Sequence, residues 1–401
     1  YYDALRSTRT GTTWEIMEYS SENKIYPAWA GTWDWADKTT TRVVFDASFR
    51  DFRPTTTATW FFRCNALKQI EGLEYLNTSE VKDMSSMFYD CQALTSIDLK
   101  HFNTKNVTDM SWMFCDCVAL TSLDLKNFDT KNVTKMGSMF AGCAALTSLD
   151  LKNFDTKNVT DMSWMFYVCS ALTSLDLKNF DTKKVTDMSW MFYGCAALTS
   201  IDLKNFDTEN VTDMSWMFYG CAALTSIDLK NFDTKKVAKM GSMFAGCAAL
   251  TSINLKNVNT KKVTDMSWMF YDCAALTSID LKSFNTKNVA DMAVMFRGCS
   301  ALNSLELQHF NTKNVTDMSL MFFDCAALTT IYCNTTWQCR ASEKMFAGCT
   351  KLKGAVAYNK NKVDAKMANP KTGYFTAKPT MVERNRRRAA HLPTARKRGA
   401  W

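Results

Sequence analysis

Hydrophobic and polar positions along most of the chain repeat with a period of 26 residues. The stretch TSLDLKNFDTKNVTDMSWMFYGCAAL recurs in close variants. One methionine of each copy marks the period: Met84, Met110, Met136, Met162, Met188, Met214, Met240, Met266, Met292 and Met318. Periods of this length are typical of solenoids, in which one unit cannot bury its apolar face alone and stacks on its neighbours. The pattern predicts an elongated array of coils.

Each copy contains one segment with the alternation of a β-strand. Leu146, Leu149 and Leu151 form an L-x-x-L-x-L pattern, so that Asp150 and Lys152 point away from the core. Because every copy supplies this strand in the same direction, the strands are expected to pair as a parallel sheet, roughly 4.8 Å per coil.

The remainder of each copy returns the chain to the next strand. Met162, Met165 and Phe166 fall at i, i+3 and i+4, the spacing of one face of a helical turn. Thr160 or Asp161 is suited to cap that turn. The predicted fold class is therefore α/β: a solenoid with a parallel β-sheet and one short helical turn per 26-residue coil, capped at both ends.

The period breaks at both ends of the array. Residues 1–59 lack the repeat, and because the first coil of a solenoid exposes an apolar end, we interpret them as an N-terminal cap. The alternative is a separate small domain with its own ligand. Residues 60–349 are the solenoid, which begins with a degenerate copy offset by 27 residues and ends with a copy that is two residues short. Residues 350–376 are expected to form a C-terminal cap, and residues 377–401 a basic, disordered tail.

The repeat motifs resemble a known family. The L-x-x-[IL]-x-L strand, the V-T-D-M-S-x-M-F run and the C-x-A-L link are similar to the bacterial surface protein repeat of the BspA-like leucine-rich-repeat family. Flanking motifs agree over about residues 1 to 376: Tyr2-Asp3, Val44-Phe45-Asp46, Ser48-Phe49, Arg53-Pro54, Leu76-Asn77-Thr78 and Gly373-Tyr374-Phe375. The resemblance implies a leucine-rich-repeat-type solenoid and a surface-exposed or secreted, adhesin-like binding protein. It supplies no catalytic residues and names no ligand.

Most of the cysteines form a ladder with the same period. Its members are Cys91, Cys117, Cys143, Cys169, Cys195, Cys221, Cys247, Cys273, Cys299 and Cys325. Stacked equivalents lie close enough for disulfides, but their Cα–Cβ bonds run parallel and keep the sulfur atoms apart. We therefore predict reduced, buried thiols that behave as small hydrophobic side chains. Cys333 and Cys339 stand outside the ladder and could pair locally.

The formal net charge of +8 is concentrated at the C-terminal end. The segment after Thr380 carries seven basic residues against Glu383, a balance of +6 that leaves +2 for the remainder. A nearly neutral solenoid gives no argument for nucleic-acid binding. The tail is interpreted either as an attachment to acidic surface polymer or nucleic acid, or as a solvated end. No run of 18 apolar residues occurs, so no transmembrane segment is expected.

Groups that could carry chemistry are few and isolated. His101 and His309 replace the asparagine of their repeats, and His391 lies in the basic tail. None has the partners of a catalytic triad or a metal site. We predict no catalytic residues, no metal site and no cofactor, and hence no enzyme.

One aspartate column and one lysine column occupy the strand face. The aspartates are Asp98, Asp124, Asp150, Asp176, Asp202, Asp228 and Asp280, and the lysines are Lys100, Lys126, Lys152, Lys178, Lys204, Lys230 and Lys282. The aspartates alone suggest calcium binding, but the lysines two residues along favour mutual compensation of charge.

An aromatic strip is the most informative variation between copies. Most copies read D-M-S-W-M-F-Y, whereas two read K-M-G-S-M-F-A, at Lys135 and Lys239. A tryptophan that serine can replace is not essential to packing, so an outward-facing strip is predicted: Trp112, Trp164, Tyr167, Trp190, Tyr193, Trp216, Tyr219, Trp268 and Tyr271. Either each indole lies flat over its neighbour and shields the seam between coils, or the strip contacts a partner.

Two functions fit these observations. The first is a non-catalytic, extracellular or cell-surface binding protein that engages a protein or glycan of a host or neighbouring cell or matrix through an extended repeat face. The strip is one candidate face, and the polar strand face, expected to be concave, is the other. The second is a structural protein whose coils or caps self-assemble end to end into a fibre or surface layer.

Overall fold

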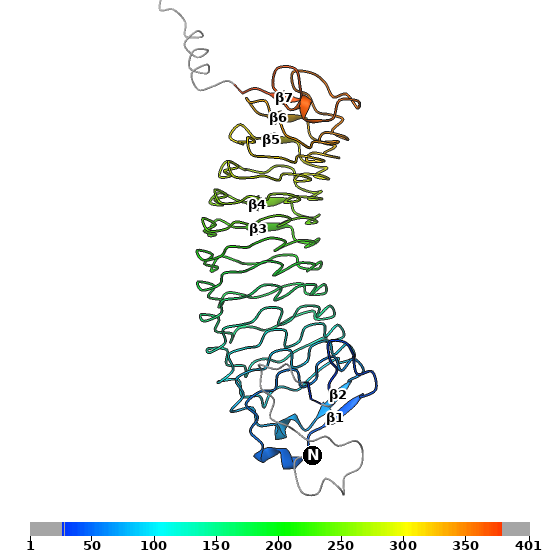
Figure 1. Cartoon of the computed structure of the whole chain (residues 1–401), viewed down its shortest axis with the longest axis vertical. Coiled ribbons are helices and arrows are strands. Elements are labelled where there is room, and N and C mark those ends of the chain that lie inside the picture. The colour runs from blue at the N-terminus through cyan, green and yellow to red at the C-terminus, as the bar shows by residue number, and fades with distance from the viewer. Residues whose placement is uncertain (1–25, 28, 379–401) are drawn as a thin grey trace, which may run out of the picture.

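The chain folds into a single stack of coils that rises from the N-terminal to the C-terminal end (Figure 1). The computed structural model describes residues 26–27 and 29–378. From Asp83 to Asp317, successive coils are joined by parallel bridges at a constant offset of 26 residues, as where Asp161 bridges Asp187 and Asp187 bridges Asp213. The predicted solenoid of 26-residue coils with parallel pairing is confirmed.

Regular strands form in only some of the coils. Strand β3 (Ser226–Asp228) pairs in parallel with β4 (Ser252–Asn254), and β5 (Ser304–Glu306) pairs in parallel with β6 (Thr330–Tyr332). The middle residue of β3 is buried between exposed neighbours, as the L-x-L alternation predicts. In the coils before β3 the equivalent segments are linked by longer contacts, such as 3.5 Å from Thr173 N to Thr147 O. The predicted continuous sheet is therefore three short sheets of two or three strands in the described residues.

The prediction of a helical turn in each coil is wrong. Every second amide of the M-S-W-M-F-Y segment donates to the next coil: Trp164 N to Ser189 O at 3.0 Å, and Phe166 N to Met191 O at 2.9 Å. The amides between them close turns within the coil, as Met165 N does with Met162 O. A helix would direct all of these amides along its own axis. The segment is thus a parallel ladder built from tight turns.

The backbone can form this ladder because it enters the left-handed region twice in each coil. In one coil these residues are Trp164, with φ 60°, and Val168, with φ 53°. The three short 3₁₀ helices among the described residues lie outside this segment: η3 (Ala47–Asp51), η4 (Leu73–Tyr75) and η5 (Ala365–Met367). The turns still bury the residues at i, i+3 and i+4, since the relative exposure of Met162, Met165 and Phe166 is 0%.

The core consists of columns of identical side chains. One phenylalanine per coil stacks in a line from Phe61 to Phe346, with neighbouring ring centroids 5.3 to 6.0 Å apart. A buried threonine column supplies polar links: Thr156 Oγ1 donates to Asp181 O at 2.9 Å and accepts from Asp181 N at 2.8 Å. The backbone N–H and C=O of Asp181 are therefore both hydrogen-bonded to the buried threonine hydroxyl.

The cysteine ladder lies inside the stack. Its ten thiols are free and buried, and Cys195 Sγ, for example, donates to Phe166 O at 3.1 Å. Burial raises the pKa of the Cys195 thiol to about 12. Outside the ladder, Cys333 is buried and Cys339 is partly exposed, and both are free thiols.

Both ends of the array add strands to the stack. Strand β1 (Arg42–Val44) pairs in parallel with β2 (Gln69–Glu71) at an offset of 27 residues, so the described part of the predicted N-terminal cap contains a further coil. At the other end, β7 (Phe375–Thr376) pairs in parallel with β6. Trp337 packs edge-on against Phe375 there, at 4.9 Å. Residues 1–25, less than half of the expected N-terminal cap, and residues 379–401, nearly all of the expected tail, lie outside the described residues.

Val168 is a β-branched residue at a left-handed position where neighbouring coils have Gly194 or Gly220. Such a residue at positive φ is strained by about 1 to 2 kcal/mol. We expect Val168→Gly to raise the free energy of unfolding by about 1 kcal/mol, measured by chemical denaturation. The reciprocal change Gly194→Val should lower it, because the φ there is 69° and a new Cβ would lie 3.2 Å from Val168 Cγ2. Equal stabilities of the three proteins would contradict the assignment of strain.

Candidate functional site

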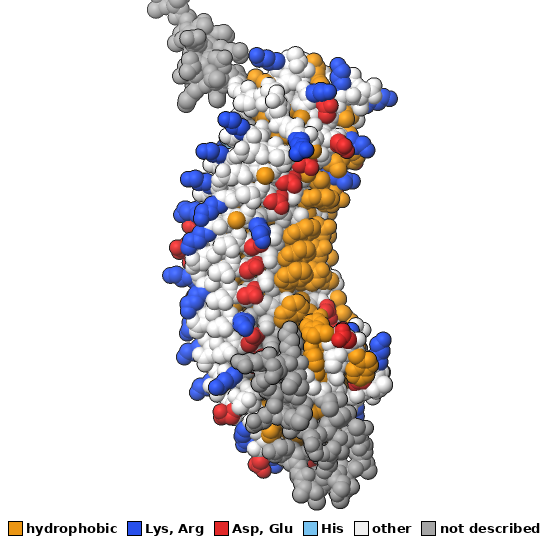
Figure 2. Space-filling model, in the orientation of Figure 1, with side chains coloured by type: hydrophobic (Ala, Val, Ile, Leu, Met, Phe, Trp, Pro, Cys, Tyr) orange, Lys and Arg blue, Asp and Glu red, His pale blue; other side chains and the backbone are white. Residues whose placement is uncertain are grey.

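The predicted aromatic residues gather into one strip on the surface. Figure 2 shows a band of hydrophobic side chains along the concave side of the molecule. The strip is carried by the ladder segment, in which the tryptophan, where a coil has one, occupies the first left-handed position. Because the methionines and phenylalanine of that segment face the core, the tryptophan and tyrosine are left outside.

Three consecutive coils form the central block of the strip. The indoles of Trp164, Trp190 and Trp216 lie in nearly parallel planes, with centroids 4.6 and 4.7 Å apart. Beside them the rings of Tyr167, Tyr193 and Tyr219 stack at 4.9 and 4.6 Å. Each indole therefore lies flat on the next, as one of the two sequence-based alternatives expects, but the edges of the rings remain at the surface.

The polar atoms of the central block have no protein partner among the described residues. The indole Nε1 atoms of Trp164, Trp190 and Trp216 and the hydroxyls of the three tyrosines make no hydrogen bond to a protein acceptor there. Burial raises the pKa of Tyr193, and the neighbouring phenols of Tyr219 and Tyr167 raise it further. The block therefore presents a double row of donors that have no acceptor among the described residues.

Aspartates run beside the aromatic strip, visible as a red column in Figure 2. Asp161 Oδ1 accepts from Ser163 N at 2.8 Å and from Ser163 Oγ at 2.7 Å, so this carboxylate also holds the start of the turn. Lysines interrupt the column in the two K-M-G-S coils. Lys135 Nζ lies 3.0 Å from Asp109 Oδ2, and Lys239 Nζ lies 3.0 Å from Asp213 Oδ2.

The two K-M-G-S coils also delimit the central block. Ser138 and Ser242, which replace the tryptophan, are each only 2% exposed, and they keep the left-handed backbone with φ 57° and 58°. A serine therefore fits the backbone of this position without change. Beyond these coils Trp112 and Trp268 are more open, with 42% and 37% exposure.

Two residues beside the strip, Tyr89 and Arg297, are missing from the strip predicted from the sequence. The predicted Trp112 lies against Tyr89, at 5.9 Å, rather than against another indole. Arg297 takes the tyrosine position of its coil, and its guanidinium lies 5.6 Å from the Tyr271 ring centre and 5.1 Å from that of Phe323. Tyr89 belongs to a coil with serine at the tryptophan position, and Arg297 departs from the consensus. Comparison of the copies at the tyrosine position alone is the signal that could have revealed both.

The stack bends toward the aromatic strip. In the central coils the indoles are separated by 4.6 to 4.7 Å, whereas the core rings of Phe192 and Phe218 are 5.4 Å apart and those of Phe206 and Phe232 are 6.4 Å apart. A stack that is shorter along one side must curve toward it. The expectation of a concave strand face is thus not met: the strip lies on the concave side (Figure 2).

The aspartates of the strand face are neutralised within their own coils. Lys100 Nζ lies 2.7 Å from Asp98 Oδ2, and Lys230 Nζ lies 3.1 Å from Asp228 Oδ2. This pairing supports compensation rather than calcium binding. In the part of the chain that the structure describes, no three His, Cys, Asp or Glu side chains gather where they could hold a metal ion. His309 Nε2 lies 2.7 Å from Leu281 O, so it links two coils as the repeat asparagine does, but through the carbonyl one residue before the asparagine's usual lysine partner.

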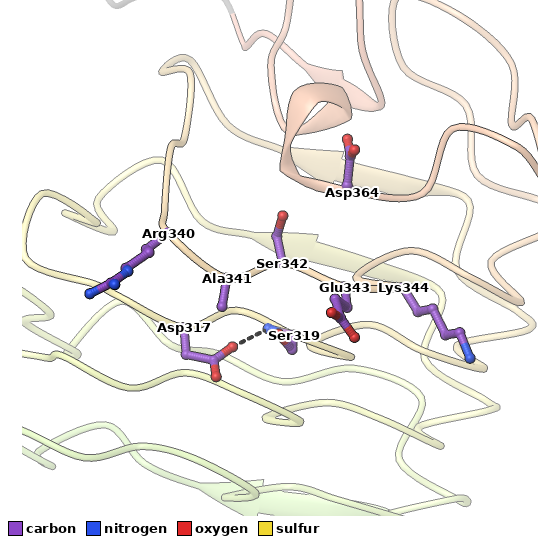
Figure 3. Close-up of a pocket in the computed structure, with 8 residues that line it drawn as sticks. All are labelled: Asp317, Ser319, Arg340, Ala341, Ser342, Glu343, Lys344 and Asp364. Carbon is purple, nitrogen blue, oxygen red and sulfur yellow. Dashed lines mark hydrogen bonds between the residues drawn. The ribbon is translucent and has the colours of Figure 1, made fainter.

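A shallow depression of about 750 Å³ lies where the last coil is two residues short. There Asp317 bridges Ala341, an offset of 24 residues that confirms the shortened copy. Arg340 and Lys344 extend away from each other (Figure 3), and Asp317 Oδ1 is bonded to Ser319 N at 2.7 Å. A catalytic site requires functional groups that converge on one point, and the charged groups of this depression do not.

The coil stack and its outward strip define a leucine-rich-repeat-type solenoid with an extended surface suited to binding. The chain belongs to the family described as "Mycoplasma protein of unknown function, DUF285", whose model matches residues 55–174, 142–255 and 248–359. The resemblance drawn from the repeat motifs is confirmed, since the matched residues span the repeats that carry it.

Two solved structures are similar to the chain. A leucine-rich repeat protein from Bacteroides ovatus is 19% identical, with a TM-score of 0.44, and the match covers 91% of each chain. A leucine rich cell surface protein from Faecalibacterium prausnitzii is 17% identical, with a TM-score of 0.40, and the match covers 82% of this chain and 96% of the other. No curated protein matches the sequence. None of the helices in the described part of the chain has the length and apolar character of a membrane span.

Proposed function

We propose that the protein is a non-catalytic, adhesin-like binding protein, secreted or displayed at a cell surface, whose central aromatic block contacts a partner. The observation that carries the proposal is the row of stacked indoles and phenols whose donors face solvent without protein partners. Exposed aromatic residues are unusual on a monomeric surface and dominate the binding energy of interfaces.

The stacking favours a protein partner at the central block. Both faces of the Trp190 indole are covered, by Trp164 and Trp216, so a partner meets ring edges, N–H groups and hydroxyls there. Sugar rings and cations need an open aromatic face. Within the described residues, Trp112 and Trp268 have no indole neighbour and are the better candidates for a glycan. The indole N–H groups and tyrosine hydroxyls along the ring edges can donate hydrogen bonds to the backbone carbonyls of a polypeptide.

The test is the double variant Trp190→Ser and Trp216→Ser. Serine already occupies this position at Ser138 and Ser242 with the same backbone, so we expect a folded protein with a far-UV circular dichroism spectrum like that of the wild type. Binding to immobilised fibronectin, collagen and fibrinogen should fall by about tenfold or more, since each anchor contributes about 1 to 2 kcal/mol or more.

The matched control is Trp112→Ser with Trp268→Ser, which removes two more exposed indoles outside the block. We expect this control to retain protein binding and to lose any binding to neutral oligosaccharides. If the block variant binds every protein of the panel as the wild type does, or if the wild type binds none, the proposed role of the block is wrong.

End-to-end assembly receives no support from the described C-terminal end. The outer edge of β6 is already paired with β7, which is only two residues long, so the free edge of this sheet is too short to form a stable ladder with a second molecule. A sedimentation measurement at micromolar concentration separates the two functions, because the binding protein is expected to be monomeric.

A further inference from the structure

A row of lysines follows the edge of the stack on the other side of the aspartate column from the aromatic strip. Figure 2 shows these basic side chains along the convex edge. One lysine per coil occupies the same repeat position in nearly every copy: Lys105, Lys131, Lys157, Lys183, Lys235, Lys261, Lys287 and Lys313, with Glu209 as the exception. Two residues before each lies an aspartate or an asparagine. Asn103 comes first, aspartates follow from Asp129 to Asp233, and asparagines return in three successive coils at Asn259, Asn285 and Asn311.

The aspartate and the asparagine have the same structural role. Asp155 Oδ1 accepts from Lys157 N at 3.1 Å, and Asn259 Oδ1 accepts from Lys261 N at 2.9 Å. The next two coils repeat the asparagine contact, at 3.1 Å for Asn285 with Lys287 N and 3.0 Å for Asn311 with Lys313 N. Either side chain closes the same turn. The exchange of Asp for Asn therefore changes only the charge of the edge.

That change leaves four neighbouring lysines without a carboxylate, and Lys262 beside Lys261 is a fifth. In two of the earlier coils the ion pair forms: Lys157 Nζ lies 3.2 Å from Asp155 Oδ2 and Lys235 Nζ lies 2.9 Å from Asp233 Oδ2. Asn259, Asn285 and Asn311 remove these partners in three successive coils, and Asn254 removes the strand partner of Lys256. The five lysines are exposed, and among the described residues none forms an ion pair: Lys256, Lys261, Lys262, Lys287 and Lys313.

These lysines lie close enough to act as one charged surface. Asn288 Nδ2 donates to Lys261 O at 2.7 Å and Asn314 Nδ2 donates to Lys287 O at 2.8 Å. The turns that carry these lysines in successive coils are therefore in direct contact. Coils repeat at roughly 4.8 Å, well inside the Debye length of about 8 Å at physiological salt. The aspartate column beside the aromatic strip is present in both halves of the array. It therefore does not account for the difference in charge between the lysine rows of the two halves. The near neutrality of the solenoid thus conceals a local basic edge.

We propose that this basic edge, over residues 254–314, binds a linear sulfated polysaccharide. A polyanion that lies along the stack would bring a negative charge to each lysine and relieve the repulsion between them. Nucleic acid is the weaker candidate. The ring of Phe284 is buried between the lysine-bearing turns, and no aromatic side chain is exposed along those turns for bases to stack on. The proposal concerns a surface separate from the aromatic strip and does not depend on its function.

The decisive variant is Asn259→Asp with Asn285→Asp and Asn311→Asp in the full chain. It keeps the three turn contacts, so we expect an unchanged melting temperature. Heparin is the probe, and its affinity should fall by about tenfold, with a weaker dependence on salt, because three carboxylates now oppose the lysines. The basic tail is the same in both proteins, so the difference between them reports the edge alone.

The matched control makes the opposite change in the other half: Asp129→Asn, Asp155→Asn and Asp181→Asn. These substitutions create a second row of lysines without carboxylates and should tighten heparin binding. Equal heparin affinity of the wild type and the first variant would overturn the proposal, because binding would then come from elsewhere, including the tail. If a single-stranded DNA oligonucleotide binds as tightly as heparin and is equally weakened by the first variant, the assignment to a polysaccharide is wrong.

Discussion

The repeat array is expected to unfold between about pH 9 and about pH 10.5 in the presence of a reductant, without added denaturant. The cause is the cysteine ladder. Burial raises the pKa of the Cys195 and Cys247 thiols to about 12, and it raises the pKa of Cys221 well above the ordinary value. The native state therefore holds these thiols protonated at a pH where the unfolded chain releases the protons.

The sign of the effect follows from this difference. A group whose pKa is raised by folding contributes its full stability below the unfolded pKa, and it loses that contribution as the pH rises toward the folded pKa. Each thiol lowers the free energy of unfolding by about 1.4 kcal/mol per pH unit above about pH 9. Ten such thiols remove about 14 kcal/mol at about pH 10, comparable to the whole stability of a typical domain.

Tryptophan fluorescence and circular dichroism along a pH titration measure this transition, and a return to neutral pH should restore the native signal. In a variant with Cys169, Cys195, Cys221 and Cys247 replaced by alanine, the free energy of unfolding should fall less steeply with pH, in proportion to the thiols removed. A native spectrum that persists to about pH 11 would show that the ladder does not couple folding to ionisation in this way.

The second large effect is expected from Phe192→Ala. The ring is fully buried between Phe166 and Phe218, with centroids 5.6 and 5.4 Å away. Truncation of a buried phenylalanine leaves a cavity and lowers the free energy of unfolding by about 3 to 5 kcal/mol. Because each coil contacts only its neighbours, the defect should also divide the array into two segments that unfold separately.

The same truncation near the end of the array is the control. Phe322→Ala removes an equivalent ring, which stacks on Phe346 at 5.5 Å, and should loosen only the last coils. Hydrogen exchange resolved by segment distinguishes the two outcomes. If both variants unfold in one transition that spans all coils, the array is more cooperative than nearest-neighbour contacts allow.

The sequence predicts the stack better than it predicts the path of the chain within a coil. Spacing alone identifies the buried Met162, Met165 and Phe166, because identical coils in register must bury identical positions. It fails on the helical turn, since turns that enter the left-handed region every fourth residue bury the same positions as a helix. A signal was present at the second left-handed position, where glycine and aspartate recur, as at Gly142 and Asp116. Both residues tolerate positive φ.

For the aromatic strip, too, the sequence predicts which side chains lie at the surface but not how they are arranged there. Serine at two tryptophan positions correctly indicates that the indoles lie outside, and the structure places Trp190 there between its neighbours. Whether the rings stack or separate depends on the distance between coils, and that distance varies across the stack. The bend arises from this variation, so no single repeat of the sequence contains it.

The constant bridge offset also has a consequence for how such proteins change over generations. Recombination between two copies of the repeat removes or adds a whole coil and leaves every remaining coil with the same neighbours and the same hydrogen bonds. The length of the array and the number of side chains that it displays can thus vary while the protein still folds. Alleles that differ in length by multiples of 26 residues are the expected trace in related strains, and insertions of other sizes should be confined to the two ends.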